Sequence, residues 1–282
     1  MRMAEGFRFP LFKLGDAFPE PFPEGLLLGV DKPLGWSSFD IVKKLRYLLM
    51  RRLSLRRIKV GHAGTLDPLA TGLLVLCIGK ATSLVEQLQE KEKEYVGTLT
   101  FGATTASHDR EQPINATFPT DHLNDALIQA ALQRFKGDVE QVPPVFSALK
   151  VNGRRLYREA RQGHEGAVRA RRIRIELFEV SPLRPVISAE DQCEPRCISQ
   201  KGVPIWLYPE YAHGKQCDFR VVCSKGTYVR SLVADLGRAV GSGAYLSKLR
   251  RIRSGSLNVE EAWTVETLEA WIRGQAGVNQ QK

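Results

Sequence analysis

The spacing of apolar residues in the first third of the chain predicts a strand, a helix and a second strand. The stretch Leu26–Asp31 has the length and composition of a short strand, and a turn with proline and glycine follows it. Ser37 is then a good N-cap for a helix whose apolar residues recur on one face. The stretch Leu73–Ile78 is apolar throughout, which is typical of a buried strand.

Helices and strands continue to alternate along the rest of the chain. The pattern predicts helices over residues 81–89, 121–135, 229–240 and 259–272, and strands over residues 95–101, 169–180 and 219–223. In the strand 169–180, apolar positions alternate with charged ones, so one face is expected in the core and the other in water. This mixed order favours an α+β fold.

The segments without such periodicity suggest the domain organisation. Residues 1–25 are rich in Phe, Pro and Gly and are expected to form an extended N-terminal arm. Residues 182–216 contain several prolines and are expected to be an insertion or long loop. Residues 264–282, which include the end of the last predicted helix, are expected to form a C-terminal tail. One domain over residues 26–263 is therefore predicted.

The charge balance indicates a polyanionic partner. The 282 residues include 41 Lys and Arg against 31 Asp and Glu, which gives a net charge of +10 and a pI near 9.5. The basic residues concentrate at residues 51–59, 169–174 and 248–253. Any one of these clusters could be a solvated surface, so charge alone does not identify the partner.

Other composition signals mainly exclude classes of protein. No apolar run approaches the roughly 20 residues of a membrane-spanning helix, and the first residues lack the apolar core of a secretory signal. A cytoplasmic location is therefore expected. Cys193 and Cys197, with Cys217 and Cys223 further on, lack the second tight pair of a typical zinc site, so reduced thiols and no metal are expected.

The strongest candidate for chemistry is the loop Gly61–Gly72. Its glycines allow a close approach of the backbone to a ligand, His62 offers a ring that can stack, and Asp67 is a carboxylate in a turn stiffened by Pro68. Composition alone would favour a structural role for Asp67, because Asp before Pro usually serves turn geometry.

The order of motifs along the chain instead favours a catalytic role for Asp67. The loop closely resembles the catalytic motif of the TruB family of tRNA pseudouridine synthases, and four further stretches resemble other motifs of that family in the right order. Together they span about residues 25–263. They are Asp31–Ser38, Lys93–Tyr95 with Gly102–Asp109, Gln141–Lys150 with its continuation to Gly163, and Ser224–Leu232 with Asp235–Gly237.

The resemblance implies a fold and a reaction. The fold would be the pseudouridine synthase fold, a mixed and largely antiparallel central sheet with flanking helices and an RNA-binding cleft. The reaction would convert the T-loop uridine at tRNA position 55 to pseudouridine: the base is flipped out, the glycosidic bond is broken, and C5 is joined to the ribose. No cofactor is implied.

The resemblance also assigns roles to single residues. Asp67 would be the nucleophile or base that acts on the nucleoside, and Arg230 would pair with it and keep it ionised. Tyr95 would stack on the flipped uracil, and Tyr228 would line its other side. His62 would enter the T-loop space left by flipped bases. Without the motifs, each of these residues has an ordinary structural explanation.

The basic clusters would hold the phosphates of the T-loop and stem of tRNA. The predicted RNA contacts are His62, Lys32, Arg56, Arg57, Lys150, Arg172, Arg174, Lys225, Arg250 and Arg251. No membrane or guide RNA is expected as a partner, and a monomer is the default expectation.

Four departures from the family pattern concern RNA contacts. Too few residues follow Arg250–Gly255 for a full C-terminal RNA-binding domain of the PUA type, Ala63 and Gln112 replace the usual threonine and glycine, and the insertion 182–216 is unusual. Two alternatives stay open: a catalytically idle RNA-binding or tRNA-folding protein, which the pair Asp67 and Arg230 disfavours, and a guide-dependent subunit, which the short C-terminus disfavours.

Overall fold

The chain forms two compact units in its computed structural model. The structure describes residues 8–146, 150–151, 154–155, 169–186, 194–199 and 204–274. The first unit comprises the residues up to Glu94 together with those from Arg250 onward, and the second comprises Tyr95–Leu249. Strand β16 (Ala244–Ser254) passes from the second unit into the first.

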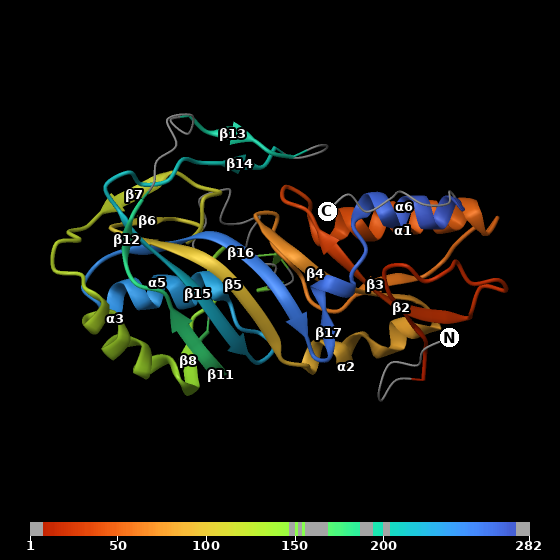
Figure 1. Cartoon of the computed structure of the whole chain (residues 1–282), viewed down its shortest axis with the longest axis horizontal. Helices are drawn as coiled ribbons and strands as arrows, with labels where there is room; N and C mark the ends of the chain where they lie inside the picture. Colours follow the sequence, from red (N-terminus) through yellow and green to blue (C-terminus); the bar gives the residue numbers. More distant parts are fainter. Residues whose placement is uncertain are drawn as a thin grey trace. The chain divides into compact units, whose positions relative to one another are not determined.

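The first unit is built around two long paired strands. β2 and β4 pair antiparallel from Gly25 opposite Gly79 to Lys32 opposite Gly72, while β1 adds to β2 in parallel and β3 to β4 antiparallel. Helices α1 and α6 lie side by side (Figure 1). The elements are β1 (Leu11–Phe12), β2 (Gly25–Lys32), α1 (Ser38–Arg52), β3 (Val60–His62), β4 (Ala70–Gly79), η1 (Lys80–Leu84), α2 (Val85–Glu90), β17 (Leu257–Asn258), η4 (Val259–Glu261) and α6 (Val265–Arg273).

Local sequence explains the best-predicted elements of this unit. Ser37 caps α1 in a capping box with Asp40, as the N-cap prediction required. The apolar run Leu73–Ile78 lies in the centre of β4 and is fully buried. The predicted N-terminal arm also contributes to the core of this unit, because Leu11 and Phe12 are buried in β1.

The second unit is a mostly antiparallel sheet with two α-helices among its described residues. β11 pairs antiparallel with β15 on one side and with β8 on the other, and α3 lies near α5 (Figure 1). The elements are β5 (Lys93–Phe101, starting at the end of the first unit), β6 (Ala103–Thr105), β7 (Ile114–Thr117), α3 (Asp125–Leu132), η2 (Gln133–Phe135), β8 (Gly137–Gln141), β9 (Lys150–Val151), β10 (Arg154–Arg155), β11 (Arg171–Val180), β12 (Arg184–Pro185), β13 (Arg196–Cys197), β14 (Trp206–Leu207), β15 (Lys215–Cys223) and α5 (Val229–Ala239).

Three predicted helices differ from the structure at their starts. The first turns after β4 form the 3₁₀ helix η1, and α2 begins only at Val85. α3 begins after Asn124, whose side chain accepts a hydrogen bond from the amide of Leu127. α6 begins after Thr264, which caps it in the same way, so η4 is separate from α6. In α3 and α6, a capping side chain inside the periodic stretch sets the start.

The long strand β16 was missed altogether, as were shorter strands such as β3 and β8. The stretch that contains the basic residues 248–253 was interpreted as a charged surface cluster, but it lies in β16. The prediction was wrong because the charge pattern is local, whereas strand formation depends on partners far away in the chain. Conversely, the predicted strand 169–180 is confirmed by β11, in which Ile173 and Ile175 are buried as expected. A register shift between Ile175 and Leu177 then breaks the predicted alternation, so that Phe178 is buried and Leu177 is only partly buried.

Where the structure describes residues 182–216, the predicted insertion consists of short strands and loops. β12 pairs with β15, and β13 pairs with β14. β15 begins at Lys215, so the last two residues of the segment belong to a strand of the second unit. None of the helices in the described part of the chain is long and apolar enough to span a membrane.

Candidate active site

Asp67 lies half-buried in the loop between β3 and β4 of the first unit. The segment that leads into α1 fixes the backbone on both sides of it. Ser38 Oγ accepts a hydrogen bond from the amide of Leu66 at 2.8 Å and donates one to its carbonyl at 3.1 Å. The carbonyl of Pro68 accepts a hydrogen bond from the amide of Gly35 at 3.0 Å. Two separate motifs of the sequence therefore meet around Asp67.

Lys32 supports the same loop from inside the unit. Its side chain is fully buried, and Nζ donates to the carbonyls of Trp36 at 2.6 Å and Pro68 at 3.5 Å. Burial lowers the pKa of Lys32 to about 7, while the charge of Asp67 acts in the opposite direction. The prediction that Lys32 contacts RNA does not fit this burial.

Arg251 of β16 holds the two ends of the same loop. Its Nη2 donates to the carbonyl of Gly64 at 3.0 Å, and its Nε donates to the carbonyl of Leu73 at 2.7 Å. The side chain is only 1% exposed, so the expected phosphate contact does not fit Arg251 either. Gly64 has a φ of +113°, and a Cβ there would lie 3.3 Å from Arg251 Nη1. The loop and the arginine therefore fit each other closely.

His62 precedes this loop in β3 and is half-buried. Burial lowers the pKa of His62, and the charge of Arg251 lowers it further. Its buried Nδ1 has no hydrogen-bond partner among the described residues. The ring is therefore neutral at neutral pH, which suits stacking better than binding a phosphate.

Arg230 is held firmly in the second unit, near the start of α5. Its side chain is 5% exposed, Nη1 donates to the carbonyl of Ser107 at 2.9 Å, and Nη2 donates to the carbonyl of Phe146 at 2.8 Å. The carboxylate of Asp109 lies 3.8 Å from Nε. A buried guanidinium with a nearby carboxylate and two carbonyl acceptors stays charged and has a defined direction.

The two predicted tyrosines also belong to the second unit. The side-chain amide of Gln141 donates to the carbonyl of Tyr228 at 3.1 Å and accepts from its amide at 2.8 Å, which fixes the residue before α5. The guanidinium of Arg171 lies 5.4 Å from the centre of the Tyr228 ring. Tyr95 lies in β5 and is 9% exposed.

Comparisons with known proteins identify the family. The family model described as "TruB family pseudouridylate synthase (N terminal domain)" matches residues 51–229, and "tRNA pseudouridylate synthase B C-terminal domain" matches residues 230–280. The chain belongs to the TruB family. It is similar to the tRNA pseudouridine synthase B of Phocaeicola vulgatus, with 44% identity over 90% of this chain and 96% of that protein. The corresponding protein of Flavobacterium johnsoniae is also 44% identical, over 89% of this chain and 97% of that one.

Solved structures confirm the predicted pseudouridine synthase fold for this TruB-family chain. A chain in the crystal structure of a Cbf5-Nop10-Gar1 complex is 26% identical, with a TM-score of 0.54, over 90% of this chain and 58% of that chain. A chain in an H/ACA RNP bound to a substrate RNA gives a TM-score of 0.55 at 24% identity, over 93% of this chain and 61% of that chain. The present chain thus spans roughly 60% of the length of these solved chains.

The remaining basic residues predicted to contact RNA differ in their surroundings. Arg56, Arg57, Arg172, Arg174 and Lys225 are exposed. Arg174 also pairs with Glu176, and Arg250 forms a bidentate pair with Asp31, at 2.9 and 2.6 Å. The side chain of Lys150 lies outside the residues that the structure describes.

Sequence reasoning assigned no role to several groups that position the candidate residues. Gln141, Ser107 and Asp109 all lie in stretches that resemble family motifs, but only the structure shows what they contact. A buried Gln or Asp in a motif is a usable signal, because a buried polar side chain needs partners. Across the described ranges, no group of three or more His, Cys, Asp or Glu side chains is placed to hold a metal ion.

Proposed function

We propose that this TruB-family chain isomerises the uridine at position 55 in the T-loop of tRNA to pseudouridine. Similarity to proteins named tRNA pseudouridine synthase B over about 90% of the chain supports the substrate and the reaction. The observation that carries the assignment to a residue is the anchoring of Asp67. Its neighbours Leu66 and Pro68 are both fixed by hydrogen bonds, so the backbone restricts the carboxylate to few positions.

The reaction needs one well-placed carboxylate and a pocket for an extruded base. The bond between C1′ of the ribose and N1 of uracil breaks, the uracil rotates, and a bond between C1′ and C5 forms. The proton on C5 is then lost and N1 gains a proton, so atoms and charge balance. Asp67 acts on the nucleoside, as nucleophile or as base, and removing a base from the helical stack is the general route to such chemistry.

The other site residues are proposed to act around this carboxylate. Arg230 pairs with Asp67 and keeps it ionised, and its defined direction in the second unit suits that role. Tyr95 stacks on the uracil, Tyr228 lines the base from the other side, and His62 fills the space left by flipped T-loop bases. Arg251 and Lys32 are proposed to support the loop rather than to bind phosphate.

Binding of tRNA is proposed to depend on the exposed basic residues. Arg56, Arg57, Arg172, Arg174 and Lys225 would contact phosphates of the T-loop and stem. Residues 26–263 are proposed to act as one catalytic domain to which both units contribute. The enzyme is proposed to act in the cytoplasm as a monomer, without a guide RNA or cofactor.

The test uses purified protein and an unmodified tRNA transcript. Pseudouridine is mapped by carbodiimide modification and primer extension, with no guide RNA or cofactor added. We expect modification of one T-loop uridine by the wild-type protein. Asp67→Asn keeps the size and the turn but removes the charge, so it should lose activity by at least about 10³-fold while tRNA affinity changes less than twofold.

Two controls make the result specific. A transcript with cytidine in place of the target uridine should yield no product, and Asp121→Asn, an exposed acidic residue of the second unit, should leave the rate unchanged. Binding of tRNA without any product from the wild-type protein would contradict the proposal and favour an idle RNA-binding protein. Full activity of Asp67→Asn would contradict the assignment of the carboxylate.

A further inference from the structure

The returning part of the insertion 182–216 contacts the loop Ser107–Arg110 of the second unit. The guanidinium of Arg110 pairs with Glu210, with 2.8 Å between Nη1 and Oε1. Arg110 Nε also donates to the carbonyl of Tyr208 at 2.6 Å, and the amide of Tyr208 donates back to the carbonyl of Arg110 at 2.9 Å. Side chain and backbone therefore join the insertion to this loop.

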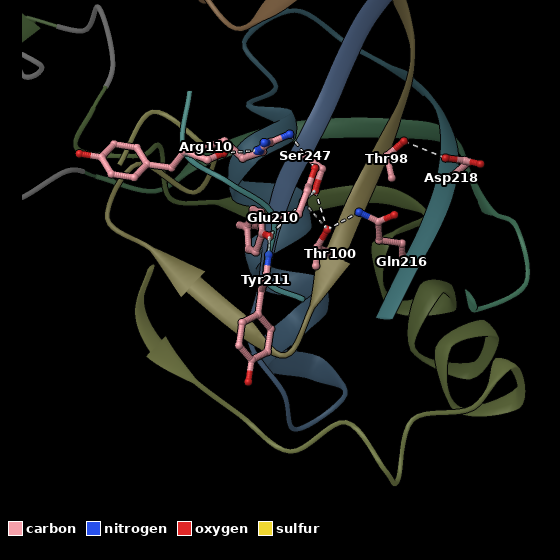
Figure 2. A network of polar contacts seen from close by, with 10 residues as sticks. Thr98, Thr100, Arg110, Glu210, Tyr211, Gln216, Asp218 and Ser247 are labelled. Atoms are coloured by element: carbon pink, nitrogen blue, oxygen red, sulfur yellow. Dashed lines mark hydrogen bonds and ion pairs between the residues drawn. The ribbon is translucent and has the colours of Figure 1, made fainter. Parts of the chain in front are cut away.

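Glu210 is itself fixed by the core of the second unit. Figure 2 shows its carboxylate next to Ser247, Thr100 and Arg110. Glu210 Oε2 accepts hydrogen bonds from Ser247 at 2.9 Å, Tyr245 at 3.0 Å and Thr100 at 3.2 Å. Burial and the negative charge of Glu210 raise the pKa of Tyr245, so its phenol stays a donor. A carboxylate with these donors and a buried guanidinium is a rigid anchor.

The loop that Arg110 belongs to is the one that holds Arg230. The carbonyl of Ser107 accepts a hydrogen bond from Arg230, and the carboxylate of Asp109 lies beside its Nε. Within the loop, Ser107 Oγ and the amide of Glu111 both donate to Asp109 Oδ1. Between them His108 has a φ of +59°. A left-handed residue other than glycine costs about 1 kcal/mol, so the loop needs support from outside.

We propose that Glu210 is a positioning residue for the reaction: through Arg110 it fixes the loop Ser107–Arg110 and so aims the guanidinium of Arg230. This gives the insertion a role in the second unit. The inference rests on the proposed function, because it assumes that Arg230 acts in catalysis. It concerns the rate of the chemical step and not the binding of tRNA.

The main test compares two substitutions that weaken the attachment of the insertion at different places. Glu210→Gln removes the charge that faces Arg110 and keeps the shape. Asp218→Asn is the matched control, because Asp218 accepts a hydrogen bond from Thr98 at 2.8 Å (Figure 2) and pairs with Arg184 at 2.8 Å, and neither partner belongs to the Ser107–Arg110 loop. In single-turnover reactions with excess enzyme, we expect Glu210→Gln to be at least about tenfold slower with an unchanged tRNA Kd. Asp218→Asn should stay within twofold of wild type.

A second measurement separates positioning from general stability. If Glu210 acts through Arg230, then Glu210→Gln should cost less than twofold when Arg230→Lys is already present, because the aimed group is gone. Urea unfolding of every variant shows how much is folded at the assay temperature. If Glu210→Gln does not fold, Arg110→Lys, which keeps a cation but loses one donor, should still slow the reaction about threefold.

Several results would overturn the inference. They are a Glu210→Gln rate within twofold of wild type, an equal loss in Asp218→Asn, or the same fold loss from Glu210→Gln with and without Arg230→Lys. An unchanged rate of Arg110→Lys would have the same effect if that variant has to be used. Failure of the proposed function is distinct, because it would appear as no product from the wild-type protein, whereas failure of this inference would leave the wild-type rate intact.

Discussion

The two units fix their candidate catalytic groups in different ways. In the first unit, buried Lys32 and Arg251 donate to backbone carbonyls of the loop around Asp67. In the second unit, the side chain of Arg230 is itself held, by the carbonyls of Ser107 and Phe146. One unit thus fixes the backbone that presents a side chain, and the other fixes the head group directly.

The difference follows from the two side chains. An aspartate has two side-chain torsions, so a rigid backbone already restricts its carboxylate to few positions. An arginine has a long flexible stem and loses much rotamer entropy when it is ordered, so its guanidinium needs partners of its own. We therefore expect damage to the first unit to act through the loop backbone and damage to the second through the partners of Arg230.

The largest effect is expected for Arg251→Met. It removes donors from two buried carbonyls, at Gly64 and Leu73, and each such loss costs about 1–3 kcal/mol. The free energy of unfolding in urea should fall by about 2–5 kcal/mol, and the pseudouridine-forming rate of the folded fraction should fall at least about tenfold. The neighbouring Arg250→Met breaks only a partly exposed pair with Asp31 and should cost under about 1 kcal/mol. Equal losses of stability in Arg251→Met and Arg250→Met would contradict the difference expected between the buried and the partly exposed arginine.

A smaller loss of stability, with a more specific cause, is expected for Gly72→Ala. A Cβ at Gly72 would lie 2.3 Å from the carbonyl oxygen of Arg251, and φ is +98°. Backbone strain and overlap should together lower stability by about 3 kcal/mol. Gly137→Ala in the second unit is the matched control, because its φ of +80° brings strain but no atom lies within 4 Å. It should cost about 1 kcal/mol in the same urea titration, and an equal cost would exclude overlap as the cause.

The pH dependence of stability probes the surroundings of Arg230. Burial, followed by the charges of Arg230 and Arg238, lowers the pKa of His108 to about 4. The unfolded chain therefore binds more protons than the folded one between about pH 4 and pH 6.5, so His108 makes stability fall as pH falls through this range. The contribution of His108 changes the free energy of unfolding by at most about 1.4 kcal/mol per pH unit. Urea unfolding of His108→Gln at several pH values should show a flatter dependence than wild type, and parallel curves would contradict this account.

The smallest effect is expected for a single exposed cation of the second unit. Lys225→Gln removes one proposed phosphate contact, so the slope of log K against log salt for tRNA binding should decrease by about 1. Lys80→Gln in the first unit breaks an exposed pair with Glu24 and should leave the slope unchanged. A salt titration of tRNA binding with both variants makes the comparison, and identical slopes would remove Lys225 from the proposed RNA surface.

The sequence alone determined the elements whose signals are local. The cap at Ser37, the apolar run of β4 and the alternation in the first half of β11 depend on neighbouring residues, and all three are found in the structure. The motif order predicted the family and the fold. The loop of Asp67 could likewise be named as the candidate site, because its glycines, histidine and aspartate are adjacent in the chain.

Only the tertiary structure decided what the buried charged residues do. Arg250 and Arg251 are neighbours in a basic stretch, yet one is paired at the surface and the other is buried against Gly64 and Leu73. Likewise, the partner of Arg110 is Glu210, a hundred residues away. A charged side chain is buried only where distant backbone and side chains supply its hydrogen bonds, and no local pattern of residues contains those distances.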